Sequence, residues 1–437
     1  MGGMEGTLVM IMAGGKGSRL APLTSHRAKP AVPFSGRYRI IDFALSNFVN
    51  SGYRRIFVLT QYMAHSLIQH LNRNWHVAGM GEFIEVAPAQ MRLGQHWYRG
   101  TADSVLQNLN LVRDLRPGHV AVFGGDHIYL FEVSQMDTQH RDTAADLTVA
   151  AVPVPIAEAS EFGILAVDAA GRITGFDEKP SSPAPMPGRP GFALASMGNY
   201  IFKAKALSEA LLSEAEVDET SYDFGRDVIP RLIAEGAAVY AYDFASNILP
   251  GAAPGTPPYW RDVGTIDSYV KANAEARARF PEVDLYNRSW RIRTAQRDYP
   301  PARFVLEGGD DSTIMLDSLV CEGSIVANAE MRQAVVGYDC FVHQDALLND
   351  VILLSGCSVG TGAKLQGVLA DMGDDGVPGL VALLERNDEM AGSACQLLGK
   401  RGDKAKRAAA LMRMMAGSAK HVPSRAECAH AVKMLGG

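Results

Sequence analysis

Cysteine is scarce in this sequence, and long apolar runs are missing. The 437 residues include five cysteines, which are widely spaced and form no C-x-x-C pair: Cys321, Cys340, Cys357, Cys395 and Cys428. This spacing disfavours a disulfide framework and a zinc site, so buried thiols are expected.

No stretch approaches the roughly 20 apolar residues of a membrane helix, and the start lacks the pattern of a secretory signal. We therefore expect a cytoplasmic protein without a membrane partner.

The sequence also lacks an excess of charge of one sign. The formal net charge is -6, which argues against a general polyanion binder and predicts no nucleic-acid partner. With 47% hydrophobic and 21% charged residues, the composition is typical of a soluble globular protein. A chain of this length exceeds one ordinary hydrophobic core, so two domains are expected.

A glycine-rich segment follows the first apolar run. The letters VMIMAGGKGSRL cover residues 9–20, and the run at 7–12 predicts a buried strand that leads into a tight loop. Glycines let a backbone approach a ligand closely, and successive N–H groups bind anions. Three cations stand nearby: Lys16, Arg19 and Lys29. The segment indicates a polyphosphate site, with a plain glycine turn as the alternative, and it matches neither a P-loop nor a dinucleotide fingerprint.

The following residues alternate between helical and extended patterns. One face of a predicted helix carries Ile41, Ala44, Leu45, Phe48 and Val49, and the strand RIFVLT comes next. A second helix, which Thr101 can cap, has a buried face of Ala102, Val105, Leu106, Leu109 and Val112. The stretch HVAVFGGDHIY predicts a strand that leads into Asp126. Strands joined through helices indicate an α/β fold with a mostly parallel sheet, which binds ligands at the carboxyl ends of its strands.

Nine motifs occur in order along the chain: AGGKGSRL, RAKPAV, RIIDFALSN, WYRGTAD, GGDHIY, EKP, ASMGNYIF, DFGRDVIP and PYWRDVGT. Together they resemble the bacterial glucose-1-phosphate adenylyltransferases, and the resemblance covers residues 8–369. It implies a Rossmann-like nucleotidyltransferase domain that uses ATP, glucose 1-phosphate and Mg²⁺. Enzymes of this family make ADP-glucose and pyrophosphate, and ADP-glucose is the activated sugar for glycogen synthesis.

The resemblance also implies site residues within these motifs. Nucleotide binding is expected of Gly14, Gly15, Gln90, Gly100 and Thr101. The expected catalytic residues are Arg19, Lys29, Asp126 and Asp262, of which the two aspartates bind Mg²⁺. The expected glucose 1-phosphate pocket comprises Tyr98, Gly163, Glu178, Lys179, Ser196, Asp223 and Trp260. Outside such motifs an aspartate is more often a cap or turn residue, and the two aromatic residues can equally be core side chains.

His127 offers a rival mechanism, in which it would act as a general base. The attacking phosphate oxygen is already ionised near neutral pH and needs no general base, so His127 is predicted to be structural.

Two further functions stay open. A related enzyme that uses another nucleotide or sugar is one alternative, although WYRGTAD and PYWRDVGT argue against it. An idle regulatory subunit is the other, and it would be expected to have lost Asp126, Lys179 or Arg19, all of which are retained.

Beyond residue 311 the apolar pattern changes its period. Every sixth residue is apolar at Val335, Phe341, Leu347, Leu353, Val359 and Leu365, with Ala329 in the same register. This period predicts a left-handed parallel β-helix, with unrelated short strands as the alternative. The predicted domains are a catalytic domain at 1–285, a linker at 286–311, the β-helix at 312–370 and an atypical tail at 371–437. The family uses its β-helix for subunit contacts and regulation, usually in a homotetramer.

The tail and the effector positions depart from the family. From Lys400 onward nine Lys or Arg stand against Asp403 and Glu427, and the composition is helical. A solvated helix or an unstructured end is the ordinary explanation, and a nucleic-acid tail or a frame-shifted gene end is the alternative. The expected residues for sugar-phosphate effectors are His26, Arg27 and Arg39. Because His26 stands where the family has lysine or arginine, we expect weak or altered activation by fructose 1,6-bisphosphate.

Overall fold

The chain folds into two compact units. The computed structural model describes residues 6–76, 79–305 and 314–371. Of these described residues, the first unit contains those within 6–16, 41–262 and 285–293, and the second contains those within 17–40, 263–284, 294–305 and 314–371. The predicted tail beyond residue 371, with Cys395 and Cys428, lies outside the described residues. Two segments of the predicted catalytic domain, Gly17–Ile40 and Val263–Asp284, belong to the second unit. The predicted domain boundaries stay predictions.

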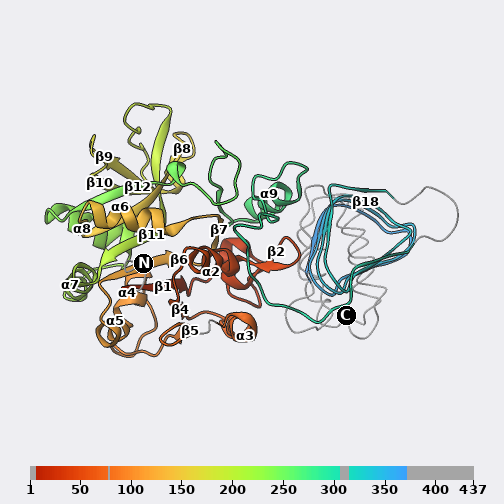
Figure 1. Cartoon of the computed structure of the whole chain (residues 1–437), viewed down its shortest axis with the longest axis horizontal. Coiled ribbons are helices and arrows are strands. Elements are labelled where there is room, and N and C mark those ends of the chain that lie inside the picture. Colours follow the sequence, from red (N-terminus) through yellow and green to blue (C-terminus); the bar gives the residue numbers. More distant parts are fainter. Residues whose placement is uncertain (1–5, 77–78, 306–313, 372–437) are drawn as a thin grey trace. The chain divides into compact units, whose positions relative to one another are not determined.

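The first unit is built on a nine-stranded sheet (Figure 1). Its strands follow the order β10-β9-β11-β6-β1-β4-β5, and β8 pairs with β11 and β12. Their bounds are β1 Thr7–Ala13, β4 Arg55–Thr60, β5 Phe83–Pro88, β6 His119–Gly124, β8 Leu147–Pro155, β9 Gly163–Val167, β10 Ile173–Glu178, β11 Phe192–Lys203 and β12 Val239–Asp243. The parallel pairing of β6, β1, β4 and β5 confirms the predicted sheet, and β11 extends it in the antiparallel sense.

Helices connect these strands. Their bounds are α2 Ile40–Asn50, α3 His65–Asn74, α4 Thr101–Leu106, α5 Leu109–Leu115, α6 Val133–Asp142, α7 Ala204–Ala215 and α8 Ile229–Ala234, with the shorter η3 Ala159–Glu161, η4 Phe224–Val228 and η5 Phe244–Ser246. The predicted apolar face of α2 is confirmed, because all five of its residues are buried. The second predicted helix is instead two helices, α4 and α5, separated at residues 107–108.

Strand β1 is the buried centre of this sheet. Leu8, Val9, Met10 and Ile11 are all 0% exposed, as expected of a parallel strand covered on both faces. Because β6 runs parallel to β1, the loops that follow the two strands leave the sheet at the same edge. The Gly125 N–H donates to the Met12 carbonyl at 3.0 Å, which ties these loops together.

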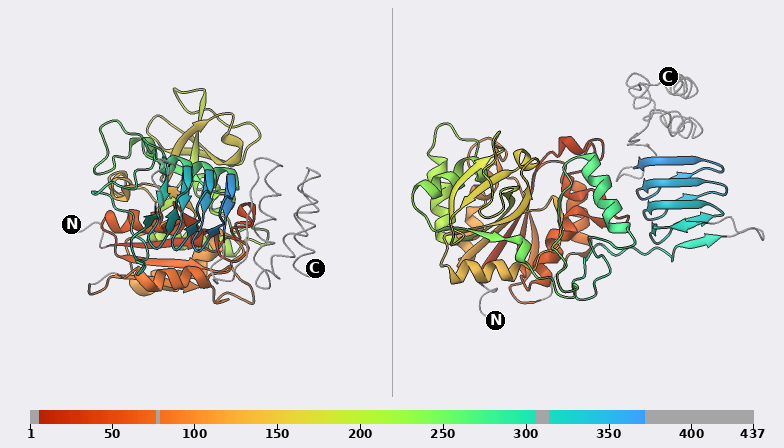
Figure 2. Two further views of the ribbon diagram at one scale, coloured as in Figure 1. Left: turned by 90° about the vertical axis from the view of Figure 1, so that its right-hand side faces the viewer. Right: turned by 90° about the horizontal axis from the view of Figure 1, so that it is seen from above.

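The second unit contains a β-helix of stacked parallel strands (Figure 2). One sheet has the order β14-β17-β19-β21, the other has β15-β18-β20-β22, and β16 pairs with β18. The bounds in this unit are η1 Ser18–Leu20, η2 Lys29–Ala31, β2 Pro33–Phe34, β3 Tyr38–Arg39, α9 Ile266–Arg277, β14 Arg303–Val305, β15 Met315–Leu316, β16 Leu319–Val320, β17 Ile325–Ala327, β18 Glu330–Val336, β19 Phe341–Val342, β20 Leu347–Leu353, β21 Ser358–Val359 and β22 Lys364–Ala370. The predicted β-helix is therefore confirmed.

The repeat of the β-helix differs from a strict period of six. Met331 pairs with Leu348 and Leu348 with Leu365, so equivalent residues stand 17 positions apart. The predicted register consequently drifts: Leu353 is buried, whereas Leu347 is 36% exposed. The prediction of buried thiols is confirmed for the described cysteines, which are Cys321, Cys340 and Cys357.

Helix α9 joins the β2–β3 hairpin to the β-helix within the second unit. Asn273 Oδ1 accepts a hydrogen bond from the Ser35 N–H at 2.9 Å. Four residues further along the helix, Arg277 donates to Asp350 Oδ1 at 2.9 Å. The same helix thus binds both partners and holds the second unit together.

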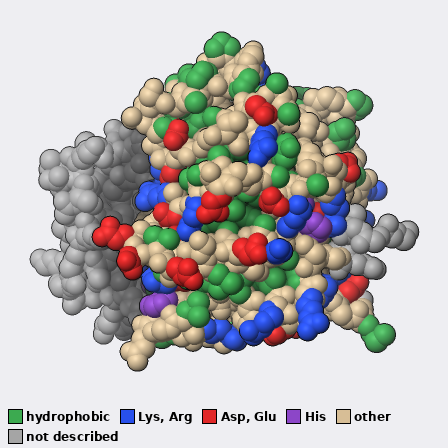
Figure 3. All heavy atoms as spheres, turned by 90° about the vertical axis from the view of Figure 1, so that its left-hand side faces the viewer, with side chains coloured by type: hydrophobic (Ala, Val, Ile, Leu, Met, Phe, Trp, Pro, Cys, Tyr) green, Lys and Arg blue, Asp and Glu red, His purple; other side chains and the backbone are tan. Residues whose placement is uncertain are grey.

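Among the described residues, no helix combines the length and the apolar character needed to cross a bilayer. The face drawn in Figure 3 intersperses acidic and basic side chains. This mixture is in keeping with the small net charge of the chain.

His140 on α6 is a buried histidine that the first unit keeps neutral. It is 1% exposed, and its Nδ1 shares a hydrogen bond with the Thr148 hydroxyl at 2.8 Å. Burial, assisted by the neighbouring His119, lowers the pKa of His140 to about 3. Because an unfolded histidine titrates near pH 6.5, the unfolded chain binds a proton below that pH that the folded chain excludes. Stability is therefore lost as the pH falls below about 6.5.

We predict that His140 lowers the free energy of unfolding by about 2 kcal/mol between pH 6.5 and pH 5. Urea denaturation at both pH values measures this change. The variant His140→Asn keeps a polar atom for Thr148 but does not titrate, so its decrease over the same interval is expected to be smaller by that amount. Equal decreases in the two proteins would show that His140 is not the group responsible.

Candidate active site

The loop after β1 brings two predicted glycines to the carboxyl edge of the sheet. A Cβ on Gly14 would lie 3.3 Å from the Cβ of Gln61 and 3.9 Å from the Tyr98 ring. A Cβ on Gly15 would meet nothing within 4 Å, so open space lies beside this backbone. Gln90 is exposed just after β5, at the same edge of the parallel sheet. Gly14, Gly15 and Gln90 thus follow the carboxyl ends of parallel strands.

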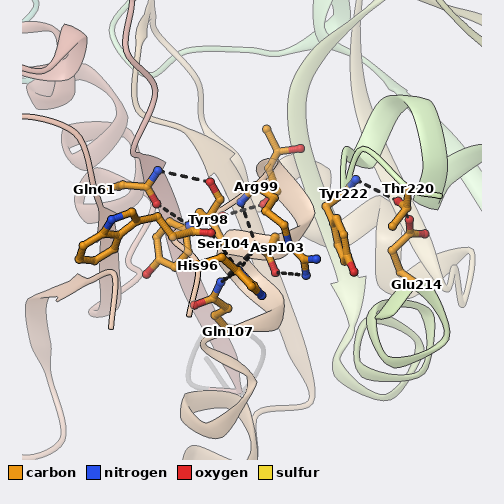
Figure 4. Close-up of polar contacts among 12 residues, drawn as sticks. Gln61, His96, Tyr98, Arg99, Asp103, Ser104, Gln107, Glu214, Thr220 and Tyr222 are labelled. Atoms are coloured by element: carbon orange, nitrogen blue, oxygen red, sulfur yellow. Dashed lines mark hydrogen bonds and ion pairs between the residues drawn. The ribbon is translucent and has the colours of Figure 1, made fainter. Parts of the chain in front are cut away.

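Gln61 holds the segment that carries Tyr98 beside this glycine loop (Figure 4). The Tyr98 N–H donates to Gln61 Oε1 at 2.6 Å, and Gln61 Nε2 donates to the Tyr98 carbonyl at 3.3 Å. Asn108 donates to the Tyr98 hydroxyl at 2.9 Å, and burial raises the pKa of Tyr98. The ring of Tyr98 lies beside Gly14. Its expected place in the sugar-phosphate pocket stays a prediction.

Asp103 organises the turn that precedes α4. Its carboxylate is buried and accepts hydrogen bonds from the Arg99 N–H at 2.9 Å, from Arg99 Nε at 3.3 Å and from Gln107 Nε2 at 3.1 Å. His96 Nδ1 lies 3.8 Å from the same carboxylate. A buried acceptor with this many donors fixes the backbone at residues 99–100.

The backbone at Gly100 packs directly against residues 221–222. A Cβ on Gly100 would lie 2.2 Å from the Tyr222 carbonyl oxygen and 2.4 Å from that of Ser221. The Ala102 N–H donates to the same Tyr222 carbonyl at 2.8 Å. Glycine is required at position 100 because no side chain fits between the two segments.

Thr101 does not cap helix α4, so that prediction was wrong. The preceding residue, Gly100, is the N-cap and has no side chain to form a capping hydrogen bond. Instead the Thr101 hydroxyl donates to Asp223 Oδ2 at 3.0 Å and accepts from the Phe224 N–H at 3.1 Å. Asp223 Oδ1 accepts from the N–H groups of Gly225 and Arg226 and caps η4. Asp223, which is predicted to belong to the glucose 1-phosphate pocket, therefore hydrogen-bonds Thr101, which is predicted to bind the nucleotide.

Glu178, Gly163 and Asp223 form a group near the ends of β9 and β10. Glu178 pairs with Gly163 across the two strands, and a Cβ on Gly163 would lie 2.8 Å from Glu178 Oε2. A Cβ on Gly225 would meet both Glu178 Oε2 at 3.1 Å and Asp223 Oδ1 at 3.3 Å. Burial and the nearby Asp223 raise the pKa of Glu178. Two neighbouring carboxyl groups are well suited to accept hydrogen bonds from hydroxyl groups.

Lys179 follows the last residue of β10, and Ser196 lies in β11. Lys179 is exposed and has a φ of 51°, and its N–H donates to the Phe162 carbonyl at 3.0 Å. Ser196 stands in β11 where the register with β8 shifts. The structure thus places an exposed ammonium directly after Glu178.

Asp126 and Asp262 flank a single histidine. Strand β7, His127–Tyr129, pairs in the antiparallel sense with β13, Trp260–Asp262, and this pairing sets Asp262 opposite His127. His127 Nε2 lies 3.8 Å from Asp126 Oδ1 and 3.6 Å from Asp262 Oδ1. The two side chains are 38% and 28% exposed, so both carboxylates are open to solvent.

This pair of carboxylates suits a cation that travels with a nucleotide. Within the described ranges, no three or more His, Cys, Asp or Glu residues are arranged to hold a metal. An ion bound by Asp126 and Asp262 would take its other ligands from phosphate and water, as Mg²⁺ commonly does. The oxygen donors therefore fit Mg²⁺ and disfavour a closed structural zinc site.

Trp260 contacts both His127, which lies between the two aspartates, and Phe162. Its ring packs edge-on against His127 at 5.5 Å between centroids and lies 5.7 Å from the ring of Phe162, the residue before Gly163. The indole Nε1 is buried and has no hydrogen-bond partner among the described residues. An unmatched buried donor is costly, and a ligand oxygen would satisfy it.

The two remaining predicted catalytic residues lie in the second unit. Arg19 is exposed on η1, and Lys29 is buried on η2. Gly17 has a φ of 60°, and a Cβ there would lie 2.8 Å from the Cβ of Lys29. The third glycine of the loop therefore permits close packing against Lys29.

The predicted effector residues differ in exposure. Arg27 is buried and binds Asp371 through two hydrogen bonds of 2.6 Å and 3.2 Å, and the side chains are 1% and 4% exposed. The Arg27 guanidinium is therefore paired with a carboxylate in this structure, and its expected role as an effector residue stays a prediction. Arg39 donates to the Ala31 carbonyl at 2.8 Å, and His26 is exposed.

Four residues of this arrangement were absent from the sequence-based prediction: Gln61, Arg99, Asp103 and Tyr222. The sequence contained a signal for Arg99 and Asp103, which stand four residues apart within WYRGTAD, a spacing that suits an ion pair on a helix. Gln61 follows the end of β4 at the ligand-binding edge, which was a weaker signal. Tyr222 gave none, because its partner lies far away in the sequence.

We predict that Gly100→Ala lowers the free energy of unfolding of the first unit by about 1 to 3 kcal/mol, because two backbone segments must separate. The matched variant Gly15→Ala adds its methyl group to open space and is expected to stay within about 0.5 kcal/mol. Urea denaturation of both variants checks the pair. Equal stability of the two would contradict the close packing at Gly100.

Comparison with known proteins agrees with this geometry. Residues 8–279 match the family model described as nucleotidyl transferase, and residues 300–380 match the GlmU-like, C-terminal hexapeptide model. Nucleotidyl transferases generally use a divalent metal.

Three relatives are named glucose-1-phosphate adenylyltransferase. The protein of Thermus thermophilus is 53% identical over 75% of this chain and 81% of its own length. That of Nitrosomonas europaea is 47% identical over 84% of each chain, and that of Aliivibrio fischeri is 46% identical over 86% of this chain and 92% of its own. The chain belongs to the glucose-1-phosphate adenylyltransferase family of nucleotidyltransferase enzymes.

Proposed function

We propose that this enzyme transfers the adenylyl group of ATP to α-D-glucose 1-phosphate and releases pyrophosphate. The product, ADP-glucose, would serve glycogen biosynthesis. The names of the relatives support this reaction. The observation that carries it is the meeting of Asp126 and Asp262 beside Trp260, with the neighbouring carboxyl groups of Glu178, at the end of β10, and of Asp223, the N-cap of η4, in the same unit.

The proposed reaction joins two anions, so alignment and charge neutralisation are most of the catalysis. An oxygen of the sugar phosphate attacks the α-phosphorus of ATP, its bond to that phosphorus forms, and the bond to the pyrophosphate oxygen breaks. The nucleophile is already ionised, so no side chain needs to remove a proton. The role of His127 is then to separate and orient Asp126 and Asp262.

In this proposal the carboxyl edge of β1, β4 and β5 binds the nucleotide. Gly14 and Gly15 expose backbone at the phosphates, and Gln90 stands beside the base. Gly100 and Thr101 complete this half. Arg19 and Lys29 are proposed to bind phosphate on the strength of their motifs.

The sugar phosphate is proposed to bind the group around Glu178. Glu178 and Asp223 accept hydrogen bonds from sugar hydroxyls, and Gly163 keeps the space beside Glu178 free of a side chain. The exposed ammonium of Lys179 binds the phosphate. Ser196 and the unmatched Nε1 of Trp260 supply further polar contacts.

Mg²⁺ is the proposed cofactor, held by Asp126 and Asp262. Bound there, it would neutralise charge on the phosphates in the transition state. The two carboxylates would hold the ion on the side of Trp260, while Lys179 supplies a positive charge next to Glu178. The remaining parts of the proposal are a homotetramer, a cytoplasmic location and sugar-phosphate effectors that contact His26 and Arg39.

Pyrophosphate release measured across nucleotides and sugar phosphates tests the proposed reaction. ATP with glucose 1-phosphate is expected to be the best pair, with ADP-glucose identified as the product. Preference for UTP, dTTP or GTP would replace the proposal with a related nucleotidyltransferase. Activity with no pair would favour a regulatory subunit.

We predict that Asp126→Asn lowers turnover by at least about two orders of magnitude, because a misplaced cation removes several kcal/mol of charge stabilisation. Steady-state kinetics at saturating substrates and Mg²⁺ measures this loss. Asp114→Asn is the matched control, since Asp114 is 64% exposed on α5 and forms an ion pair with the exposed Arg113. Near-normal turnover in Asp126→Asn would remove Asp126 from the metal site.

We predict that Lys179→Ala raises the KM for glucose 1-phosphate at least about tenfold and leaves the KM for ATP nearly unchanged, because one cation is lost from one substrate. The control is Lys205→Ala, since Lys205 is 84% exposed on α7. Kinetics with each substrate varied in turn separates the two constants. Equal changes in both would place Lys179 outside the sugar-phosphate pocket.

A further inference from the structure

Two segments of the first unit meet in a contact that we name the latch. It consists of Arg99, Gly100 and Thr101 on one side, and of Tyr222, Asp223 and Phe224 on the other. The Arg99 guanidinium carbon lies 3.6 Å from the centroid of the Tyr222 ring (Figure 4). The close backbone packing at Gly100 and the Thr101–Asp223 hydrogen bond lie directly beside this stacked pair.

Each side of the latch is anchored from behind. On one side, the buried Asp103 holds the backbone and the side chain of Arg99. On the other side, the Tyr222 N–H donates to the Thr220 hydroxyl at 3.0 Å, and Thr220 in turn bonds the buried Glu214, which pairs with Arg231. The Tyr222 ring is thus a fixed platform, and it is 7% exposed.

Arg99 supplies the stacking side chain of the contact. Its side chain is 40% exposed, and its planar guanidinium both bonds Asp103 and stacks on Tyr222. A lysine cannot do both, because it lacks a planar face and a fork of donors. The stacked pair therefore adds attraction between segments that belong to different proposed substrate sites.

We propose that Arg99 is a positioning residue that keeps the latch closed and so pre-organises the nucleotide site and the sugar-phosphate site together. This inference rests on the proposed function, since it takes ATP at Gly100 and Thr101 and glucose 1-phosphate at Asp223. Both substrates then bind only the closed arrangement. The observed dissociation constant of each equals its intrinsic value divided by the closed fraction.

A weakened latch has a distinctive thermodynamic consequence. Because one equilibrium limits both substrates, loss of Arg99 weakens both by the same factor. Saturation with either substrate closes the latch, so it restores the affinity for the other. A residue that touches one substrate, or one that only stabilises the fold, gives neither the equal factors nor this mutual rescue.

The test is isothermal titration of the whole chain with glucose 1-phosphate and with α,β-methylene-ATP plus Mg²⁺, which binds without reacting. Each ligand is titrated alone and in the presence of saturating amounts of the other. We expect Arg99→Ala and Tyr222→Leu to weaken both ligands alone by about three- to tenfold, the range of a cation–π contact of this exposure. Each loss is expected to disappear when the other ligand is saturating.

Three controls sharpen the experiment. Tyr222→Phe keeps the ring and is expected to behave as the unaltered protein, as is Arg113→Ala, which removes an arginine that is 80% exposed on α5. The double variant Arg99→Ala/Tyr222→Leu is expected to lose no more than either single variant.

If the two dissociation constants rise by unequal factors, the latch is overturned while the proposed function stays intact. The same holds if a saturating amount of the second ligand does not restore the affinity for the first. Unchanged affinities in Arg99→Ala would overturn the latch in the same way. Failure of the unaltered protein to bind either ligand would overturn the proposed function and, with it, the latch.

Discussion

The arrangement of the candidate site depends on the parallel pairing of β1 with β6. The register sets Ile11 beside Phe123 and Met12 beside Gly124, so both strands end at the same edge of the sheet. The glycine loop and the loop that carries Asp126 leave the sheet there, side by side. Strand β7 continues from this point and pairs with β13, which brings Asp262 opposite His127. A parallel pair at the centre of the sheet therefore determines where the two aspartates can meet.

The described part of this site is dominated by carboxylates. Asp126 and Asp262 flank His127, and Glu178 and Asp223 are close enough for Asp223 to contribute to the raised pKa of Glu178. Such a site repels two phosphorylated substrates unless cations accompany them. In the proposed mechanism, a divalent metal at the two aspartates and the ammonium of Lys179 would supply these cations.

The sequence was sufficient to predict features that repeat or that follow strand ends. The buried face of α2, strand β4 and the loops after β1 and β6 all follow from apolar periodicity and glycine placement. The sequence was insufficient where a side chain hydrogen-bonds a residue that is distant in the chain instead of a neighbouring one. Thr101 bonds Asp223 instead of capping its own helix, and Leu347 turns outward because the coil repeats every 17 residues. The contact of Arg99 with Tyr222 depends on the folded chain and has no local pattern.

The central claim is that Asp126 and Asp262 hold one divalent cation at the edge where the nucleotide binds. The most direct measurement is a crystal structure grown with Mn²⁺ and α,β-methylene-ATP, with anomalous diffraction recorded for manganese. The account predicts an anomalous peak within coordination distance of both carboxylates and of a nucleotide phosphate. A manganese peak that contacts neither aspartate, beside a well-ordered nucleotide, would contradict it.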